Sequence, residues 1–362
     1  MDVRAVLRLE ERGEGWVLVG GAAARFGLVD EYLSHLLDRN YSRATVRAYG
    51  FDLLAFCRWL TEQDLELEAV TTNVLLDYLR ACREATVPGR PGPNVVTMTG
   101  QRVDRYAATT INRRLAAISG LFTFAGLRSP DAKNPVPRGR EARWTVSGER
   151  SGMLAHTTRR RKSRSALRLR EPTKLPVALS ASDAAELVGS LRTWRDRAIA
   201  GLMLWCGLRS CEVLGLGVRD VDIGGRWVTV TGKGCKQRRV PLDADVASVI
   251  DVYLLVERPE STSDRLFLVA KGPHRGQGLT PAGLRTIFRY HRELTGVKGG
   301  HPHALRHTFG TVLAEAGVDL AVMQALLGHA HVDTTARYVH LAPAHVKAEF
   351  DAARERLRAQ NR

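Results

Sequence analysis

The chain has 362 residues, which is long for one hydrophobic core and sufficient for two domains. Hydrophobic residues make up 44% and charged residues 25%, as in ordinary globular proteins, and no apolar run approaches the roughly 20 residues that cross a bilayer. The formal net charge of +16 predicts a polyanionic partner, of which nucleic acid is the commonest.

Charges interrupt the first 15 residues, where a secretion signal needs an apolar segment, so we expect a cytoplasmic protein with no membrane partner. We assign residues 1–25 to an N-terminal leader. Five scattered cysteines without a C-x-x-C pair predict reduced thiols rather than disulfides or a zinc site.

Residues 26–127 have apolar side chains at helical spacing and predict a small all-helical domain. Ser42 is a good N-cap for its second helix, which contains Val46, Leu53 and Leu60. The segment "TTNVLLDYLRACREA" predicts a third helix, and "ATTINRRLAAISGLFTFAG" a fourth that ends at Gly126.

Residues 128–174 lose this periodicity and have 14 Lys and Arg against 4 Asp and Glu. We interpret the segment as a basic linker. It could be a solvated tether or a binding surface, and the two interpretations are compatible because a tether can become ordered when it binds phosphates. The residues expected to contact nucleic acid are in its densest run: Arg159, Arg160, Arg161, Lys162 and Arg164.

The second domain is predicted over residues 175–342 and should be mainly helical with a small β-sheet. Ser180 caps its first helix, and Thr280 with Pro281 begins a later one. The run "WRDRAIAGLMLWCGL" predicts a buried helix, and "RWVTVTGKGCKQRRVPL" a β-hairpin. Glycines break the final helices at Gly317 and Gly328.

Polar residues at the ends of these elements form a set suited to anions. Arg209 begins a helix, Lys233 lies at the hairpin tip, and "HPHALRH" and "LLGH" supply histidines and Arg306. Guanidinium groups match phosphate oxygens in pairs, while lysine and histidine can transfer protons and Tyr338 can form a covalent intermediate. The set therefore predicts phosphoryl transfer with cations in place of magnesium, and no metal or other cofactor.

Taken singly, each residue has an ordinary structural interpretation. Arg209 could form an ion pair with Glu212, Lys233 could be a solvated turn lysine, and Tyr338 could be a core aromatic. For His307 we favour a buried structural histidine. Zinc is disfavoured because two arginines would repel a cation and no cysteine or carboxylate completes a tetrahedral set.

Four blocks in order resemble the catalytic domain of the tyrosine recombinases, the phage integrase family: "GLRSCEVLGL", "GKGCKQRRVPL", "HALRHTFGTVLAEAGVDLAVMQALLGH" and "TTARYVH". The helical segment 26–127 is similar to that family's core-binding domain. The resemblance implies that Arg209 and Arg306 bind the scissile phosphate. It gives Glu212 a supporting, orienting role.

The resemblance also implies roles for four further residues. Lys233 matches the general acid for the leaving 5′-oxygen, and His303 the histidine that assists proton transfer at the nucleophile. His329 matches a residue that hydrogen-bonds a phosphate oxygen, and Tyr338 the nucleophile. A linker longer than usual in the family suggests additional DNA contact.

The activity implied is site-specific recombination of double-stranded DNA through a 3′-phosphotyrosyl link, without metal or ATP. A synaptic tetramer is implied, with the free protein a monomer as one option. The C-terminal tail, residues 343–362, has an apolar stripe that could pack on its own domain or on a neighbour. A type IB topoisomerase-like enzyme and a non-catalytic DNA-binding regulator remain alternatives, and a metal-dependent nuclease is a weaker one.

Overall fold

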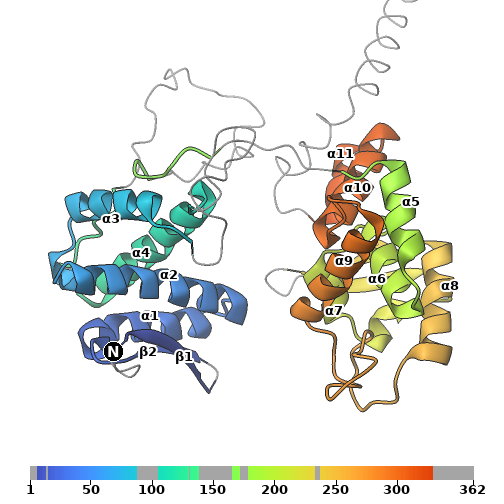
Figure 1. Cartoon of the computed structure of the whole chain (residues 1–362), viewed down its shortest axis with the longest axis horizontal. Helices are drawn as coiled ribbons and strands as arrows, with labels where there is room; N and C mark the ends of the chain where they lie inside the picture. The colour runs from blue at the N-terminus through green and yellow to red at the C-terminus, as the bar shows by residue number, and fades with distance from the viewer. Residues whose placement is uncertain are drawn as a thin grey trace, which may run out of the picture. The chain divides into compact units, whose positions relative to one another are not determined.

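A computed structural model describes residues 6–13, 15–87, 105–129, 131–137, 165–171, 178–232 and 237–328. The chain divides into two compact units, Met1–Pro172 and Thr173–Arg362. Both are rich in helix and each has a small antiparallel sheet (Figure 1), so the predicted fold class, mainly α with a small β-sheet, is confirmed. No helix in the described ranges is long and apolar enough to span a membrane.

The first unit begins with a hairpin and continues as a bundle of helices. Strands β1 (Arg8–Arg12) and β2 (Gly15–Val19) pair antiparallel. The helical elements are η1 (Ala23–Phe26), α1 (Gly27–Asp38), α2 (Arg43–Glu62), η2 (Leu67–Ala69), α3 (Thr72–Glu84) and α4 (Ala108–Arg128).

Local capping chemistry explains where two of these helices begin. The Ser42 hydroxyl accepts a hydrogen bond from the Thr45 amide at 3.2 Å, which confirms it as the N-cap of α2. Thr71 caps α3 in the same way. Helix α4 continues past Gly126 to Arg128, two residues beyond its predicted end, because Gly126 keeps helical geometry and the Ser129 amide closes the last turn on Ala125.

The hairpin in residues 8–19 was not predicted. Leu7 and Leu18 are buried in the same core as α1, α2 and α4, and Leu9 packs against Gly50 of α2. Part of segment 128–174 also joins this core, since the Asn112 side chain donates to the Leu169 carbonyl at 3.0 Å. These segments therefore belong to the first folded unit.

The second unit contains α5 (Ala181–Ser190), α6 (Trp194–Leu204), α7 (Ser210–Gly215), η4 (Val218–Asp220), β3 (Val221–Asp222), β4 (Trp227–Thr231), β5 (Gln237–Pro241), α8 (Ala244–Val252), the π-helical η5 (Tyr253–Glu257), α9 (Pro281–Thr295), α10 (Pro302–Glu315) and α11 (Leu320–Leu327). Helix α6 contacts α7, α8, η5 and α10 and is buried almost throughout. Its prediction as a buried helix is confirmed.

The sheet of the second unit has the order β3-β4-β5, with both pairs antiparallel. The predicted hairpin is confirmed by its two strands, which pair from Trp227 opposite Pro241 to Thr231 opposite Gln237. The Ser180 and Thr280 caps are confirmed, with hydroxyls accepting from Asp183 and Gly283 amides. Left-handed Gly317 and Gly328 follow α10 and α11, as predicted.

Candidate functional site

Arg209 is placed by the sharp turn that leaves α6. Gly207 has a φ of +66°, and a side chain there would meet the Phe309 ring, so glycine is required by both backbone and space. The chain then re-enters a helix with Arg209 as the N-cap of α7. The turn at Gly207 and the N-terminus of α7 therefore fix where the Arg209 backbone lies.

Glu212 lies one turn into α7 and is buried, with its carboxylate directed back at Arg209. The Arg209 amide donates to Oε2 at 2.8 Å and Arg209 Nη1 donates to Oε1 at 2.8 Å. The ion pair that the sequence suggested for Arg209 thus exists. It orients the guanidinium, whose side chain remains 30% exposed.

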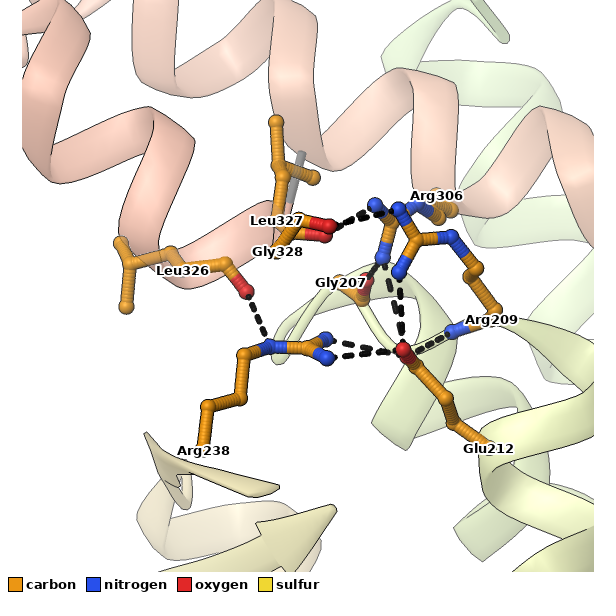
Figure 2. A network of polar contacts seen from close by, with 8 residues as sticks. All are labelled: Gly207, Arg209, Glu212, Arg238, Arg306, Leu326, Leu327 and Gly328. Carbon is orange, nitrogen blue, oxygen red and sulfur yellow. Dashed lines mark hydrogen bonds and ion pairs between the residues drawn. The ribbon is translucent and has the colours of Figure 1, made fainter. Parts of the chain in front are cut away.

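Arg238 of β5 contacts the same carboxylate from the opposite direction. Its Nη1 donates to Glu212 Oε1 at 2.7 Å and its Nη2 to Oε2 at 3.0 Å, a bidentate pair. Its Nε donates to the Leu326 carbonyl at 3.2 Å. Figure 2 shows the Arg238 side chain reaching from the sheet toward both partners.

Arg306 of α10 is the third guanidinium around Glu212. It is buried, with Nη1 3.9 Å from Glu212 Oε2. Nη1 also donates to the Gly207 carbonyl and Nη2 to the Leu327 carbonyl. Arg306 therefore joins the turn after α6 to the end of α11.

The three arginines donate hydrogen bonds to the backbone carbonyls of three consecutive residues. Arg238 donates to Leu326, Arg306 to Leu327, and Arg209 to Gly328 at 3.0 Å (Figure 2). A helix C-terminus has carbonyls without intrahelical partners and carries partial negative charge. The C-terminus of α11 and the Glu212 carboxylate together hold the three cations in one cluster.

The electrostatics of the cluster follow from this arrangement. Burial alone would raise the pKa of Glu212, but hydrogen bonds from Arg238 and the Arg209 amide, with the charges of both arginines, lower it to about 2. Glu212 is thus ionised at neutral pH, and three guanidiniums around one carboxylate leave two positive charges in excess. Such a centre can bind an anion, and Arg209 has the most exposed side chain of the three.

Histidines of α10 lie near the cluster. His303 is exposed one turn before Arg306, and its ring centroid lies 6.5 Å from that of His307. His307 is half-buried, and burial together with the charges of His303 and Arg306 lowers its pKa. His301 caps the helix, because its Nδ1 accepts from the Ala304 amide at 3.0 Å.

Several predicted site residues lie outside the described residues: Lys233, His329, Tyr338, Arg159, Arg160, Arg161, Lys162 and Arg164. The tail 343–362 lies outside them too. The structure describes the chain up to Gly232 and from Gln237, on the two sides of Lys233, and up to Gly328, immediately before His329. Of the seven residues assigned catalytic or supporting roles, it brings together Arg209, Glu212 and Arg306, with His303 on the helix that carries Arg306.

Arg238 was not among the site residues predicted from the sequence. A signal for it existed, since side chains alternate along a strand and Arg238 is two residues from buried Val240, on the same face of β5. Arg239 is on the opposite face of the strand and is exposed. Its guanidinium carbon lies 4.8 Å from the centroid of the Trp227 ring. Within the described ranges, no three His, Cys, Asp or Glu side chains form a group that could hold a metal ion.

Comparison with known proteins gives two family matches and many relatives. The phage integrase family model matches residues 178–345, and the model of the phage integrase N-terminal SAM-like domain matches residues 29–128. A protein named tyrosine recombinase XerC from Mycobacterium bovis is 32% identical over 90% of this chain and 97% of its own length. Another of that name from Roseiflexus castenholzii is 31% identical, over 86% and 88%.

Two solved structures have a similar fold. The XerH site-specific recombinase bound to palindromic difH substrate matches with a TM-score of 0.59 and 21% identity, over 86% of this chain and 80% of that one. The Tn1549 transposon integrase in complex with circular intermediate DNA matches with a TM-score of 0.57 and 18% identity, over 86% and 94%. At these identities the likeness concerns the fold.

Proposed function

Because the chain is a tyrosine-type site-specific recombinase of the phage integrase family, we propose that it breaks and rejoins DNA strands through a covalent 3′-phosphotyrosyl intermediate. The observation that carries this is the cluster of Arg209 and Arg306 on the buried Glu212 carboxylate. Two guanidiniums fixed side by side suit the non-bridging oxygens of one phosphodiester.

In the proposed reaction the Tyr338 hydroxyl attacks the phosphorus, and the bond from phosphorus to the 5′-oxygen breaks. His303 assists removal of the tyrosine proton, and Lys233 protonates the leaving 5′-oxygen. The 5′-hydroxyl of a partner duplex then attacks the phosphotyrosine and releases Tyr338. The number of phosphodiester bonds is conserved, so the reaction needs neither ATP nor a metal.

The charges are proposed to act in the transition state. Negative charge on the phosphoryl oxygens increases as the phosphorus becomes pentacoordinate, and Arg209, Arg306 and His329 donate hydrogen bonds to these oxygens. Glu212 keeps Arg209 in place without approaching the phosphate. Donors fixed before the reaction stabilise the developing charge without a reorganisation cost, and one such donor is typically worth about 10²–10³ in rate.

Double-stranded DNA is the proposed partner, as the net charge of +16 favours. The similar Tn1549 integrase structure is a complex with circular intermediate DNA, and the XerH structure is a complex with its difH substrate, which supports this. The basic run of linker 128–174, Arg159, Arg160, Arg161, Lys162 and Arg164, is proposed to bind the DNA backbone. The proposal also includes a synaptic tetramer and a cytoplasmic location.

The proposed domain division is a helical DNA-binding domain at 26–127, the linker at 128–174, a catalytic domain at 175–342 and a tail at 343–362. The chain divides into two compact units between Pro172 and Thr173, which supports the main boundary of this division. The described part of leader 1–25 forms the hairpin of the first unit, so we propose that leader and helical domain act as one body.

Trapping on a nicked suicide duplex tests the function. The wild-type protein should become covalently linked to DNA in EDTA, and Tyr338→Phe should bind the same duplex without forming the link. A link in the Tyr338→Phe protein would show that the nucleophile is another residue. Relaxation of supercoiled plasmid lacking any recombination site would instead support a topoisomerase.

A further inference from the structure

Arg238 connects three segments that the proposed reaction requires. It extends from β5, forms a bidentate pair with Glu212 of α7, and bonds the Leu326 carbonyl at the end of α11. Lys233 precedes Arg238 by five residues on the same hairpin, and His329 follows Leu326 by three residues. The Arg238 side chain therefore joins two elements to the arginine cluster: strand β5, which follows Lys233 in the sequence, and the end of α11, which precedes His329.

We infer that Arg238 is a positioning residue for strand cleavage, which holds Glu212 and the end of α11 in the geometry that the phosphate-binding arginines need. This rests on the proposed function, because cleavage is the reaction whose rate reports the geometry. Arg238 itself is not expected to touch the phosphate. No role for it followed from the sequence.

The contacts of Arg238 distinguish it from Arg209, the more exposed of the two proposed phosphate-binding arginines. Each of its three nitrogens has a partner within the protein, and its side chain is 17% exposed against 30% for Arg209. Arg209 shares Glu212 Oε1 with Arg238, at 2.8 and 2.7 Å. Removing Arg238 leaves this buried carboxylate to pull Arg209 and Arg306 closer, away from an incoming phosphate.

The space around Arg238 is also specific. A Cβ at Gly328 would lie 2.8 Å from the Arg238 guanidinium carbon, so the guanidinium fits against the bare backbone where α11 ends. Loss of the bond to Leu326 would free this helix end from the sheet. A displacement of about 1 Å at reacting groups can cost about 10²-fold in rate.

Arg238→Gln, Arg238→Lys and the neighbouring Arg239→Gln test the inference in the full-length protein. Each is assayed for single-turnover cleavage of the nicked suicide duplex and, separately, for the Kd of an uncleavable duplex. Arg239 is the matched control, because it lies one residue away, has the same charge and faces Trp227 instead of Glu212.

We expect Arg238→Gln to lower the cleavage rate at saturating DNA about 10–10²-fold, with Kd within about 2-fold of wild type. Arg238→Lys should recover only part of the rate, since an ammonium keeps the charge but not the planar fork. Arg239→Gln should cleave at the wild-type rate at saturating DNA. A wild-type maximal rate in Arg238→Gln, or a defect confined to Kd, would overturn the inference.

Thermal denaturation accompanies each assay. If Arg238→Gln does not fold, the Arg238→Lys protein decides: full cleavage in that variant overturns the need for the fork, and a reduced maximal rate in the folded variant supports it. The wild-type and Tyr338→Phe proteins are run in parallel. Absence of covalent complex with the wild type refutes the proposed function, whereas wild-type cleavage by Arg238→Gln refutes only the role of Arg238.

Discussion

Arg209 donates a hydrogen bond to the Gly328 carbonyl at 3.0 Å, although 119 residues separate the two in sequence. The bond ties the first arginine of the cluster to the last residue before His329. Gly328 has a φ of +60°, a left-handed geometry that favours glycine, and it ends α11. The geometry of the site therefore depends on a residue that has no side chain.

Gly328→Ala should destabilise the second unit and slow cleavage. A left-handed alanine costs about 1–2 kcal/mol, and its Cβ would displace the Arg238 guanidinium. Gly296→Ala is the control, because Gly296 also ends a helix with left-handed geometry, at +74°, but a Cβ there would meet nothing within 4 Å. Urea unfolding and suicide-substrate cleavage measure the two effects. Equal loss of cleavage in both variants would contradict a specific role for Gly328.

Glu212→Gln should destabilise the second unit by about 3–5 kcal/mol, because it leaves guanidiniums clustered without their anion. It should also slow cleavage. Calorimetry of the full-length protein and single-turnover cleavage are the measurements. A melting temperature equal to that of the wild type would show that the cluster does not need the carboxylate.

The pH dependence of stability provides a second readout for Glu212. Its folded pKa, about 2, lies below the ordinary glutamate value of 4.5, so its contribution to stability is complete above pH 4.5 and is lost as pH falls toward 2. The linked change is about 3 kcal/mol. The unfolding free energy of Glu212→Gln should lack this loss. An identical slope in both proteins below pH 4.5 would contradict the assignment.

Much of the fold of the second unit could be predicted because its helices begin with local signals in the sequence. Thr280 and Ser180 cap helices by local hydrogen bonds. The apolar run of α6 has no polar side, so this run must be buried in the core. Arg238 was harder because "QRRVP" contains two adjacent arginines. Alternation along the strand places Arg238 on the same face as buried Val240, but its contact with Glu212 of α7 is set by the tertiary fold.

The N-terminal hairpin escaped prediction for a related reason. Its first strand, "RLEER", is mostly charged and partly exposed, and the hydrophobic residues that fix it lie at separated positions. Leu7 and Leu18 are buried only once α1 and α2 are present to cover them. Tertiary packing rather than local preference determines these strands.

Protonation of His291 should lower the stability of the second unit in mild acid. The Ser190 hydroxyl donates to the Leu187 carbonyl at 2.6 Å, so it accepts a hydrogen bond from His291 Nδ1 at 3.0 Å. Burial lowers the pKa of His291 below 6.5, with Asp196 acting in the opposite direction. The unfolded chain therefore takes up a proton first, and the unfolding free energy falls as pH decreases from above 6.5 through the folded pKa.

The measurement is urea unfolding between pH 7.5 and 5.5. His291→Gln should be less stable at pH 7.5, because it loses packing and the bond to Ser190, and its stability should change less with pH. His301 and His307, whose pKa values are also lowered, keep part of the slope in the variant. A slope as steep as that of the wild type would exclude His291 as a contributor.

Asp52 makes the corresponding prediction for the first unit. It is buried in α2, and Arg113 of α4 donates to both of its oxygens, at 2.7 and 3.0 Å. Asp52→Asn should destabilise this unit by about 2 kcal/mol, since an amide cannot accept both bonds and hydrogen bonds to charged groups contribute about 1.5–3 kcal/mol. Arg113 is half-exposed, which limits the loss.

Asp77→Asn is the control for Asp52→Asn. Asp77 pairs with Arg80 at 3.2 Å on the exposed surface of α3, where an ion pair contributes about 0.5 kcal/mol or less. Calorimetry of the full-length proteins should therefore show a lower melting temperature of the first unit in Asp52→Asn only. If both variants lose equal stability, burial does not strengthen the pair between α2 and α4. The orientation of Arg113 would then have to come from another contact of α4.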